Sequence, residues 1–109
     1  SQKLRALAIA SATRAKMAPD LPPLIEAGVP GFTVTQWHGL LAPRGTPRAV
    51  IDRLHKEIAK AVHRPEVTAR LALDGTDGIA SSPQEFAAHL RSERERWTKV
   101  AKAADIRSN

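Results

Sequence analysis

Four histidines have the widest chemical repertoire in this 109-residue chain. They are His38, His55, His63 and His89. A zinc site needs at least three convergent ligands, and two ligands on one helix usually stand roughly four residues apart. His55 and His63 are eight residues apart, and the HExxH pattern does not occur. We therefore expect surface histidines and no metal site.

Serine and carboxylate patterns do not predict an enzyme. No serine stands in a G-x-S-x-G elbow, and Ser82 is explained as a helix cap. Asp74 and Asp77 flank a glycine in a predicted turn, where solvated carboxylates are not poised as an acid and a base. Neither G-x-x-x-x-G-K-[ST] nor G-x-G-x-x-G is present. We expect no catalytic residue and no cofactor.

Side chains near the ends of two predicted strands are better candidates for ligand binding. Ser11 and Thr13 follow the first strand, and Trp37 and His38 lie on the second, which Gly39 interrupts. Ligand pockets in α/β folds gather beyond strand ends and between domains. These four side chains are our candidate binding residues. Two alternatives stay open, because Trp37 also suits a core and Ser11 and Thr13 also suit a simple turn.

Extended segments are predicted from short apolar or β-branched runs. Residues 4–10 are apolar apart from Arg5, and residues 32–41 are rich in β-branched and aromatic side chains. Both runs predict strands. Residues 76–81 are also expected to be extended, with Ile79 buried. Together with three predicted helices, these two or three strands indicate an α/β fold.

The three helices are predicted from apolar spacing and start signals. Thr46-Pro47 and Ser82-Pro83 each place a capping residue before a proline, which favours helix starts at both points. Glu85 stands three residues after Ser82 and completes a capping box. The first helix is expected to end at Arg64-Pro65, a short second one to span 66–73, and the third to end near residue 104.

Two other functions stay open, one suggested by the charge of the chain and one by the apolar surface that a fragment would expose. The chain's 17 Lys and Arg against 11 Asp and Glu give a formal net charge of +6. Acids and bases alternate along 91–96, which is typical of a solvated helix face. A small basic nucleic-acid-binding domain is one alternative, but no recognised motif supports it and we expect no nucleic acid. A self-associating structural domain is the other, because a fragment of a larger fold would expose apolar surface.

Five segments in order resemble the tripartite tricarboxylate transporter receptor family, also called TctC or Bug. Residues 3–8 read K-L-R-A-L-A, and residues 21–32 end in E-A-G-V-P-G-F. Residues 37–47 read W-H-G-L-L-A-P-R-G-T-P. Residues 82–86 and 97–100 follow at family-like spacing. Each segment alone is weak evidence, but five in the right order are specific, and they cover essentially the whole chain.

The resemblance implies a C-terminal fragment of a two-lobed periplasmic binding protein of type II-like fold. Residues 1–42 would be a lobe-crossover segment with two strands, and 43–109 the C-terminal helical part of the N-terminal lobe. The implied function is an extracytoplasmic receptor, not an enzyme, for a small organic carboxylate or amino acid.

The same resemblance implies partners and a location. Membrane transporter subunits would take up the solute, and the parent protein would be periplasmic, secreted with a signal peptide absent from this chain. The exposed surface of a fragment would also allow a homo-oligomer. The family often has an aromatic residue where this chain has His38, which is expected to alter ligand preference if that position faces the cleft.

Overall fold

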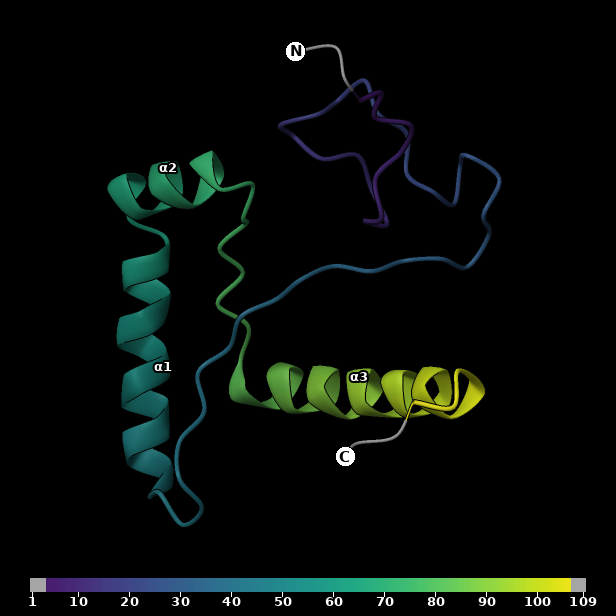
Figure 1. The fold of residues 1–109 in the computed structure, drawn as a ribbon. Helices are drawn as coiled ribbons and strands as arrows, with labels where there is room; N and C mark the ends of the chain where they lie inside the picture. The colour runs from purple at the N-terminus through teal and green to yellow at the C-terminus, as the bar shows by residue number, and fades with distance from the viewer. Residues whose placement is uncertain (1–3, 107–109) are drawn as a thin grey trace. The chain divides into compact units, whose positions relative to one another are not determined.

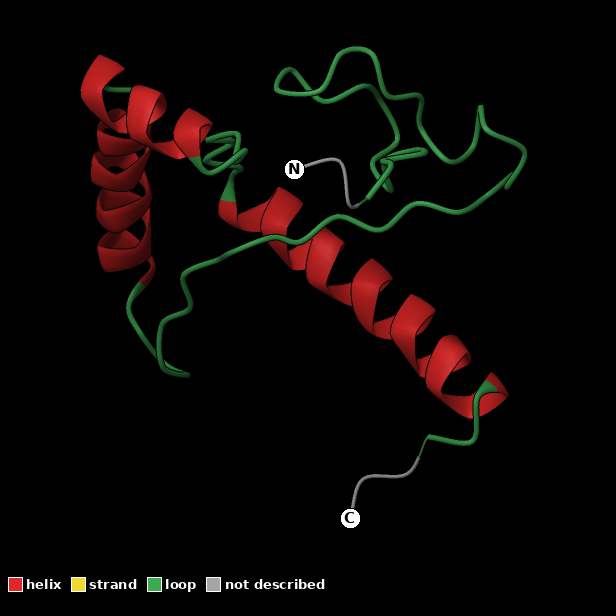
Figure 2. Ribbon diagram, turned by 45° about the horizontal axis from the view of Figure 1, so that its top comes forward, coloured by secondary structure: helices red, strands yellow, loops and turns green. Residues whose placement is uncertain are grey.

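Three helices form the regular structure of residues 4–106 (Figure 1). The computed structural model describes residues 4–106, so Lys3 of the first family-like segment lies outside the described residues. The helices are α1 (Arg48–Val62), α2 (Pro65–Leu73) and α3 (Pro83–Ala103). The other described residues form loops and turns (Figure 2). The prediction of three helices is confirmed, with ends within a few residues of those expected.

The start of α1 differs from its prediction in one detail. Pro47 occupies the N-cap position, and no side chain caps the helix. Thr46, the predicted cap, instead donates its hydroxyl to the Pro43 carbonyl at 2.8 Å. This bond closes the preceding turn, where Gly45 has a φ of +86°. The predicted Thr46 cap is therefore wrong, because a hydroxyl that can reach a neighbouring carbonyl can close a turn as well as a helix end.

The start of α3 is the predicted capping box. The Ser82 hydroxyl accepts from the Glu85 backbone N–H at 3.2 Å. The Glu85 carboxylate accepts from the Ser82 backbone N–H at 2.8 Å. The pKa of the Glu85 carboxyl lies below its ordinary value, because the carboxylate accepts first from the Ser82 backbone N–H and second from the Ser82 hydroxyl. The backbone N–H groups of Ser82 and Glu85 at this helix start thus both have local hydrogen-bond acceptors.

The predicted strands are not confirmed within residues 4–106. The only β-type pairing there is an isolated parallel bridge between Ile9 and Pro23. Residues 32–41 run without a ladder, although the Val34 N–H donates to the Ala10 carbonyl at 2.8 Å. A strand is stable only when neighbouring backbone lies along it, and Pro23 has no N–H to extend the bridge. Strand propensity in these segments therefore lacks the partner that a ladder requires.

The described residues divide into two compact units. One unit comprises residues 4–41 and 69–77, and the other comprises 42–68 and 78–106. In the first, Lys16 and Asp77 form an ion pair at 3.1 Å. In the second, a ring nitrogen of His55 on α1 lies 3.3 Å from the Ala80 carbonyl, shortly before α3. Each unit therefore has contacts of its own between segments distant in the sequence.

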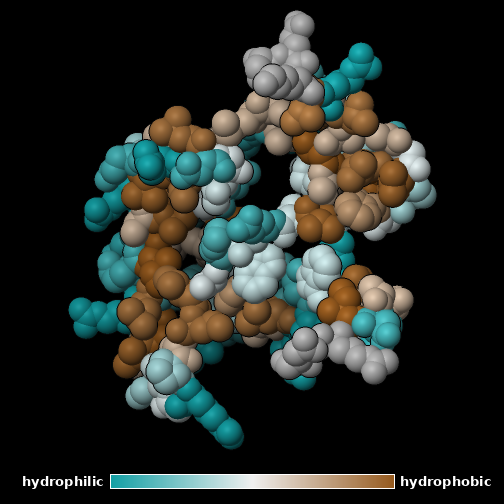
Figure 3. Space-filling model, in the orientation of Figure 1, coloured by the Kyte–Doolittle hydropathy of each residue, from teal (hydrophilic) through white to brown (hydrophobic). Residues whose placement is uncertain are grey.

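Apolar side chains of the described residues lie largely at the surface. Pro23 is fully buried, and no other hydrophobic side chain in 4–106 reaches burial. Figure 3 shows apolar residues at the surface over α1, where Val50 and Leu54 are 45% and 50% exposed. Ile79, expected to be buried, is 77% exposed, because the segment around it pairs with no strand. These apolar surfaces lack the cover that hydrophobic burial favours.

Candidate functional site

The candidate site begins at a loop whose two ends are tied together. The Ile9 N–H donates to the Pro22 carbonyl at 2.9 Å, and the Leu24 N–H donates to the Ile9 carbonyl at 2.8 Å. The buried Pro23 lies between these two bonds. Residues 10–21 therefore form a closed loop, with Ser11 and Thr13 just beyond its base.

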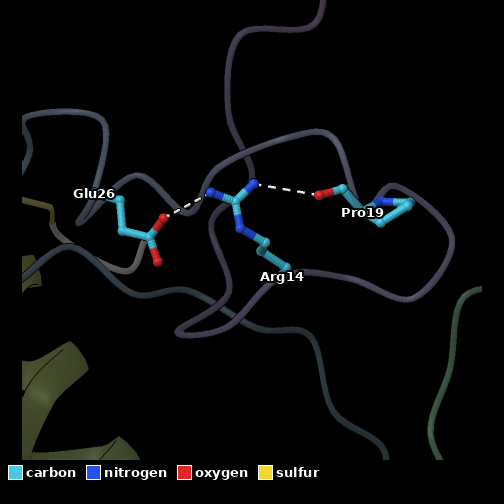
Figure 4. Close-up of polar contacts among 3 residues, drawn as sticks. All are labelled: Arg14, Pro19 and Glu26. Carbon is cyan, nitrogen blue, oxygen red and sulfur yellow. Dashed lines mark hydrogen bonds and ion pairs between the residues drawn. The ribbon is translucent and has the colours of Figure 1, made fainter.

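A guanidinium connects three parts of this region (Figure 4). Arg14 donates through one terminal nitrogen to the Pro19 carbonyl at 3.2 Å. Through the other it donates to the Glu26 carboxylate at 2.9 Å. Pro19 lies further along the same loop, and Glu26 lies in the turn that follows the loop base. We call Arg14, Pro19 and Glu26 the Arg14 clamp.

The segment between the loop base and the Arg14 clamp carries the predicted hydroxyls. The Ser11 hydroxyl donates to the Thr13 carbonyl at 2.6 Å, which closes a short turn. Within residues 4–106, the Thr13 hydroxyl and the backbone N–H groups from Ser11 to Arg14 have no hydrogen-bond acceptor. Consecutive N–H groups and hydroxyls of this kind are the donors that an anionic oxygen accepts from. The turn is therefore suited to a carboxylate.

The aromatic part of the candidate site lies further along the same unit. Trp37 is 39% exposed, and His38 is exposed as well. Their segment is joined to the first one by the bond between the Val34 N–H and the Ala10 carbonyl. The structure brings Ser11 and Thr13 together. Trp37 and His38 line neither of two open hollows, which lie on α1 and on α3.

Sequence reasoning missed Arg14 and Glu26. The two residues are 12 apart, a spacing that matches neither a helix face nor a hairpin register. Only the closed loop between them brings the charges together. The one available signal was a pair of opposite charges on either side of Pro19, Pro22 and Pro23, which was too general to indicate a contact.

The described residues carry neither a metal-binding cluster nor a membrane-spanning helix. No cluster of three or more His, Asp or Glu side chains within residues 4–106 is arranged to hold a metal ion. None of the three helices in that range has both the length and the apolar character needed for a membrane crossing. The candidate site consists of hydroxyls, backbone donors and aromatic rings.

The fold of this chain is found in a solved carboxylate complex. The structure described as R. palustris Rpa4515 with adipate matches 93% of the chain and 34% of its own length. Sequence identity is 37% and the TM-score is 0.78. The likeness assigns the chain to the class of periplasmic-binding-protein-like folds.

The family follows from two sequence comparisons. The model of the tripartite tricarboxylate transporter family receptor matches residues 1–106. A UPF0065 protein from the tcbD-tcbE intergenic region of Pseudomonas sp. strain P51 is 41% identical over 92% of the chain. Protein BugT of Bordetella pertussis is 31% identical over 94% of it. The chain belongs to the tripartite tricarboxylate transporter receptor family, which confirms the resemblance seen in its motifs.

The chain is short relative to these proteins. It spans 30% of the Pseudomonas protein and 31% of BugT. About a third of a receptor length is therefore present in the sequence, and the two alternatives of a nucleic-acid-binding domain and a self-associating domain gain no support from the comparisons.

Proposed function

We propose that this chain is part of an extracytoplasmic solute receptor that binds a small carboxylate-bearing solute and delivers it to a tripartite tricarboxylate-type transporter. The observation that supports this most directly is its 37% identity, over 93% of the chain, to a structure determined with adipate. We further propose a periplasmic location and no catalytic activity, as suits a receptor family.

The proposed ligand contacts start with the turn after Ile9. A carboxylate is an acceptor only, so its oxygens need N–H or O–H donors. The backbone N–H groups from Ser11 to Arg14 and the Thr13 hydroxyl supply them, because none is used within residues 4–106. The Ser11 hydroxyl joins by rotating from the Thr13 carbonyl toward the ligand. In this proposal the turn grips one carboxylate of the solute.

Trp37 and His38 are proposed to face the body of the solute. Trp37 is 39% exposed and His38 is exposed as well, so each presents part of its ring to a solute. An indole covers apolar surface at a low cost in side-chain entropy, and an imidazole adds a polar atom beside it. We propose that Trp37 contacts the carbon chain of the solute and that His38 influences which solute is preferred.

The remaining receptor length is proposed to cover the apolar surfaces of the chain. Val50 and Leu54 on α1 and Trp97 and Val100 on α3 are each between 44% and 50% exposed. In a two-lobed receptor, residues 1–42 would form the lobe crossover and 43–109 the helical part of the lobe that holds the receptor's N-terminus. The helices would then bury these side chains against the rest of that lobe.

The test is a calorimetric titration of the protein encoded by the complete reading frame. The panel contains adipate, other di- and tricarboxylates, amino acids and aromatic acids. We expect saturable binding of a carboxylate and its weakening by roughly tenfold in a Ser11→Ala, Thr13→Val double variant, the range for lost hydrogen bonds to a charged group. Ser92→Ala, an exposed helical serine, is the matched control and should bind normally.

Specificity is tested in the same titrations with His38→Tyr. This substitution restores the aromatic side chain common in the family and is expected to reorder the affinities of the panel. An unchanged order would remove His38 from the site. Failure of every compound to bind a protein shown to be folded would reject the proposed function as a whole.

A further inference from the structure

We propose that Arg14 is a positioning residue of the carboxylate site, because its guanidinium fixes the turn at 11–13 by joining the Pro19 carbonyl to the Glu26 carboxylate. The inference rests on the proposed function and deepens it. It assigns a role to a charged side chain that does not itself touch the solute. The role follows from where Arg14 lies relative to the loop base, not from its charge alone.

The turn at 11–13 is held from both sides. On one side, Ile9 is bonded to Pro22 and Leu24, and the Ala10 carbonyl accepts from Val34. On the other side, Arg14 immediately follows Thr13 and is anchored at 3.2 Å to the Pro19 carbonyl and at 2.9 Å to Glu26. Only three residues separate the two anchors. The backbone conformation of these three residues therefore depends on both anchors.

An arginine suits this task better than a lysine would. Its planar guanidinium presents several N–H donors in a rigid fork, so one side chain serves two acceptors in different directions. Figure 4 shows these two contacts leaving the same guanidinium, toward Pro19 and toward Glu26. A lysine ammonium keeps the charge for Glu26 but does not reproduce the fixed angle between the two acceptors.

The clamp is expected to affect binding more than folding. The side chains of Arg14 and Glu26 are 48% and 54% exposed, and ion pairs this accessible contribute little to global stability. Ordering of a loop before the ligand arrives lowers the entropic cost of binding. Loss of the clamp should therefore weaken the solute while leaving the unfolding transition nearly unchanged. A residue with a merely structural role would alter both together.

The experiment compares Arg14→Gln, Arg14→Lys and Glu26→Gln in the protein encoded by the complete reading frame. Adipate is the probe in calorimetry, and amide hydrogen exchange is measured at residues 11–14 without ligand. We expect Arg14→Gln to weaken adipate roughly tenfold, as for loss of a pre-ordered loop, and to speed exchange at the turn. Glu26→Gln should show a smaller loss, and Arg14→Lys should recover part of the affinity.

Arg48→Gln is the matched control. Arg48 forms an ion pair of similar length and exposure, 2.8 Å to Asp52, but within α1. This variant should change neither adipate affinity nor exchange at residues 11–14. Unchanged affinity and exchange in Arg14→Gln, with adipate still bound by the unmodified protein, would overturn the positioning role alone. Absence of any carboxylate binding by the unmodified protein would overturn the proposed function and the role together, and faster exchange would then show only a loop contact.

Discussion

The contacts that stabilise one compact unit internally differ in kind from those that stabilise the other. In residues 42–68 and 78–106, two of the three helices are complete and are stabilised by neighbours a few residues away, such as the capping box of α3 and the Arg48–Asp52 pair of α1. In residues 4–41 and 69–77, regular structure is limited to part of α2. There the shape depends on bonds between distant segments, including Ile9 with Pro22 and Arg14 with Glu26.

This difference indicates which unit adapts to a ligand. Helical hydrogen bonds are local and form cooperatively, so a helix fixes its own backbone. A loop fixed by a few long-range contacts has little redundancy, and the loss of one contact releases the segment beyond it. The candidate binding residues all lie in the loop-rich unit. Ligand affinity should therefore depend on single contacts in the loop-rich unit. The backbone of the helical unit should keep its structure when one of its own contacts is lost.

The largest effect of a single substitution is expected at Gly28, in the loop-rich unit. Its φ of +100° is costly for any residue with a Cβ, and the space around it is open, so Gly28→Ala tests backbone conformation alone. We expect local destabilisation of about 1–2 kcal/mol. Amide exchange at Val29, whose N–H donates to the Leu24 carbonyl at 3.0 Å, should quicken accordingly.

The control for Gly28 is Gly39→Ala in the same unit. Gly39 is also exposed but is not among the described glycines with positive φ. It should leave exchange at Val29 unchanged. Equal exchange in both variants would mean that the turn at Gly28 is not held in its left-handed conformation, and the contrast between the two units would lose its basis.

The fold was predictable where its causes are local. Ser82, Pro83 and Glu85 together indicate one helix start, and the structure confirms it because all three act within a single turn. Thr46-Pro47 carries the same type of signal, yet the Thr46 hydroxyl bonds to the Pro43 carbonyl instead. Two acceptable partners for one hydroxyl cannot be ranked from sequence alone. The predicted strands at 4–10 and 32–41 are not confirmed. A ladder needs a neighbouring strand, and residue propensity does not supply one.

The candidate site was predictable only in part. Ser11, Thr13, Trp37 and His38 were chosen from residue type and from their position beside predicted strands, and their role in binding stays a prediction. Arg14 was not chosen, because its importance arises from a contact across 12 residues that no periodic pattern encodes. Several of the motifs that identify the family form turns and helix starts, such as those at 26–32, 43–47 and 82–86. They therefore indicate the type of receptor more clearly than they indicate the ligand contacts.

A medium effect is expected for Ser82→Ala in the helical unit. The substitution removes the hydroxyl that accepts from the Glu85 N–H at 3.2 Å. N-cap losses of this kind cost about 1 kcal/mol. Amide protection should fall in the first turn of α3 and stay constant at Val29 in the other unit. Ser92→Ala, in the interior of the same helix, is the control and should have no such effect. A matching loss at Val29 would contradict the independence of the two units.

The smallest effect is a pH dependence of the α3 start. Hydrogen bonds from the Ser82 backbone N–H and hydroxyl lower the pKa of Glu85 in the folded state from its ordinary value of 4.5. Between the two pKa values the unfolded chain binds more protons than the folded one, so acid favours unfolding. The stabilisation by Glu85 is complete above pH 4.5 and is lost as the pH falls through the lower, folded-state value. Amide protection in the first turn of α3 should fall over that range.

Glu85→Gln isolates this contribution from the other carboxylates. Glutamine keeps an oxygen that can accept from the Ser82 N–H, but it does not titrate. The variant should start with slightly weaker protection near neutral pH, because a neutral acceptor bonds less strongly than a carboxylate. Its protection should then change less on acidification than that of the unmodified chain. Identical acid profiles would show that the Glu85 carboxylate does not stabilise the helix, and that the Ser82 hydroxyl alone is the effective cap of α3.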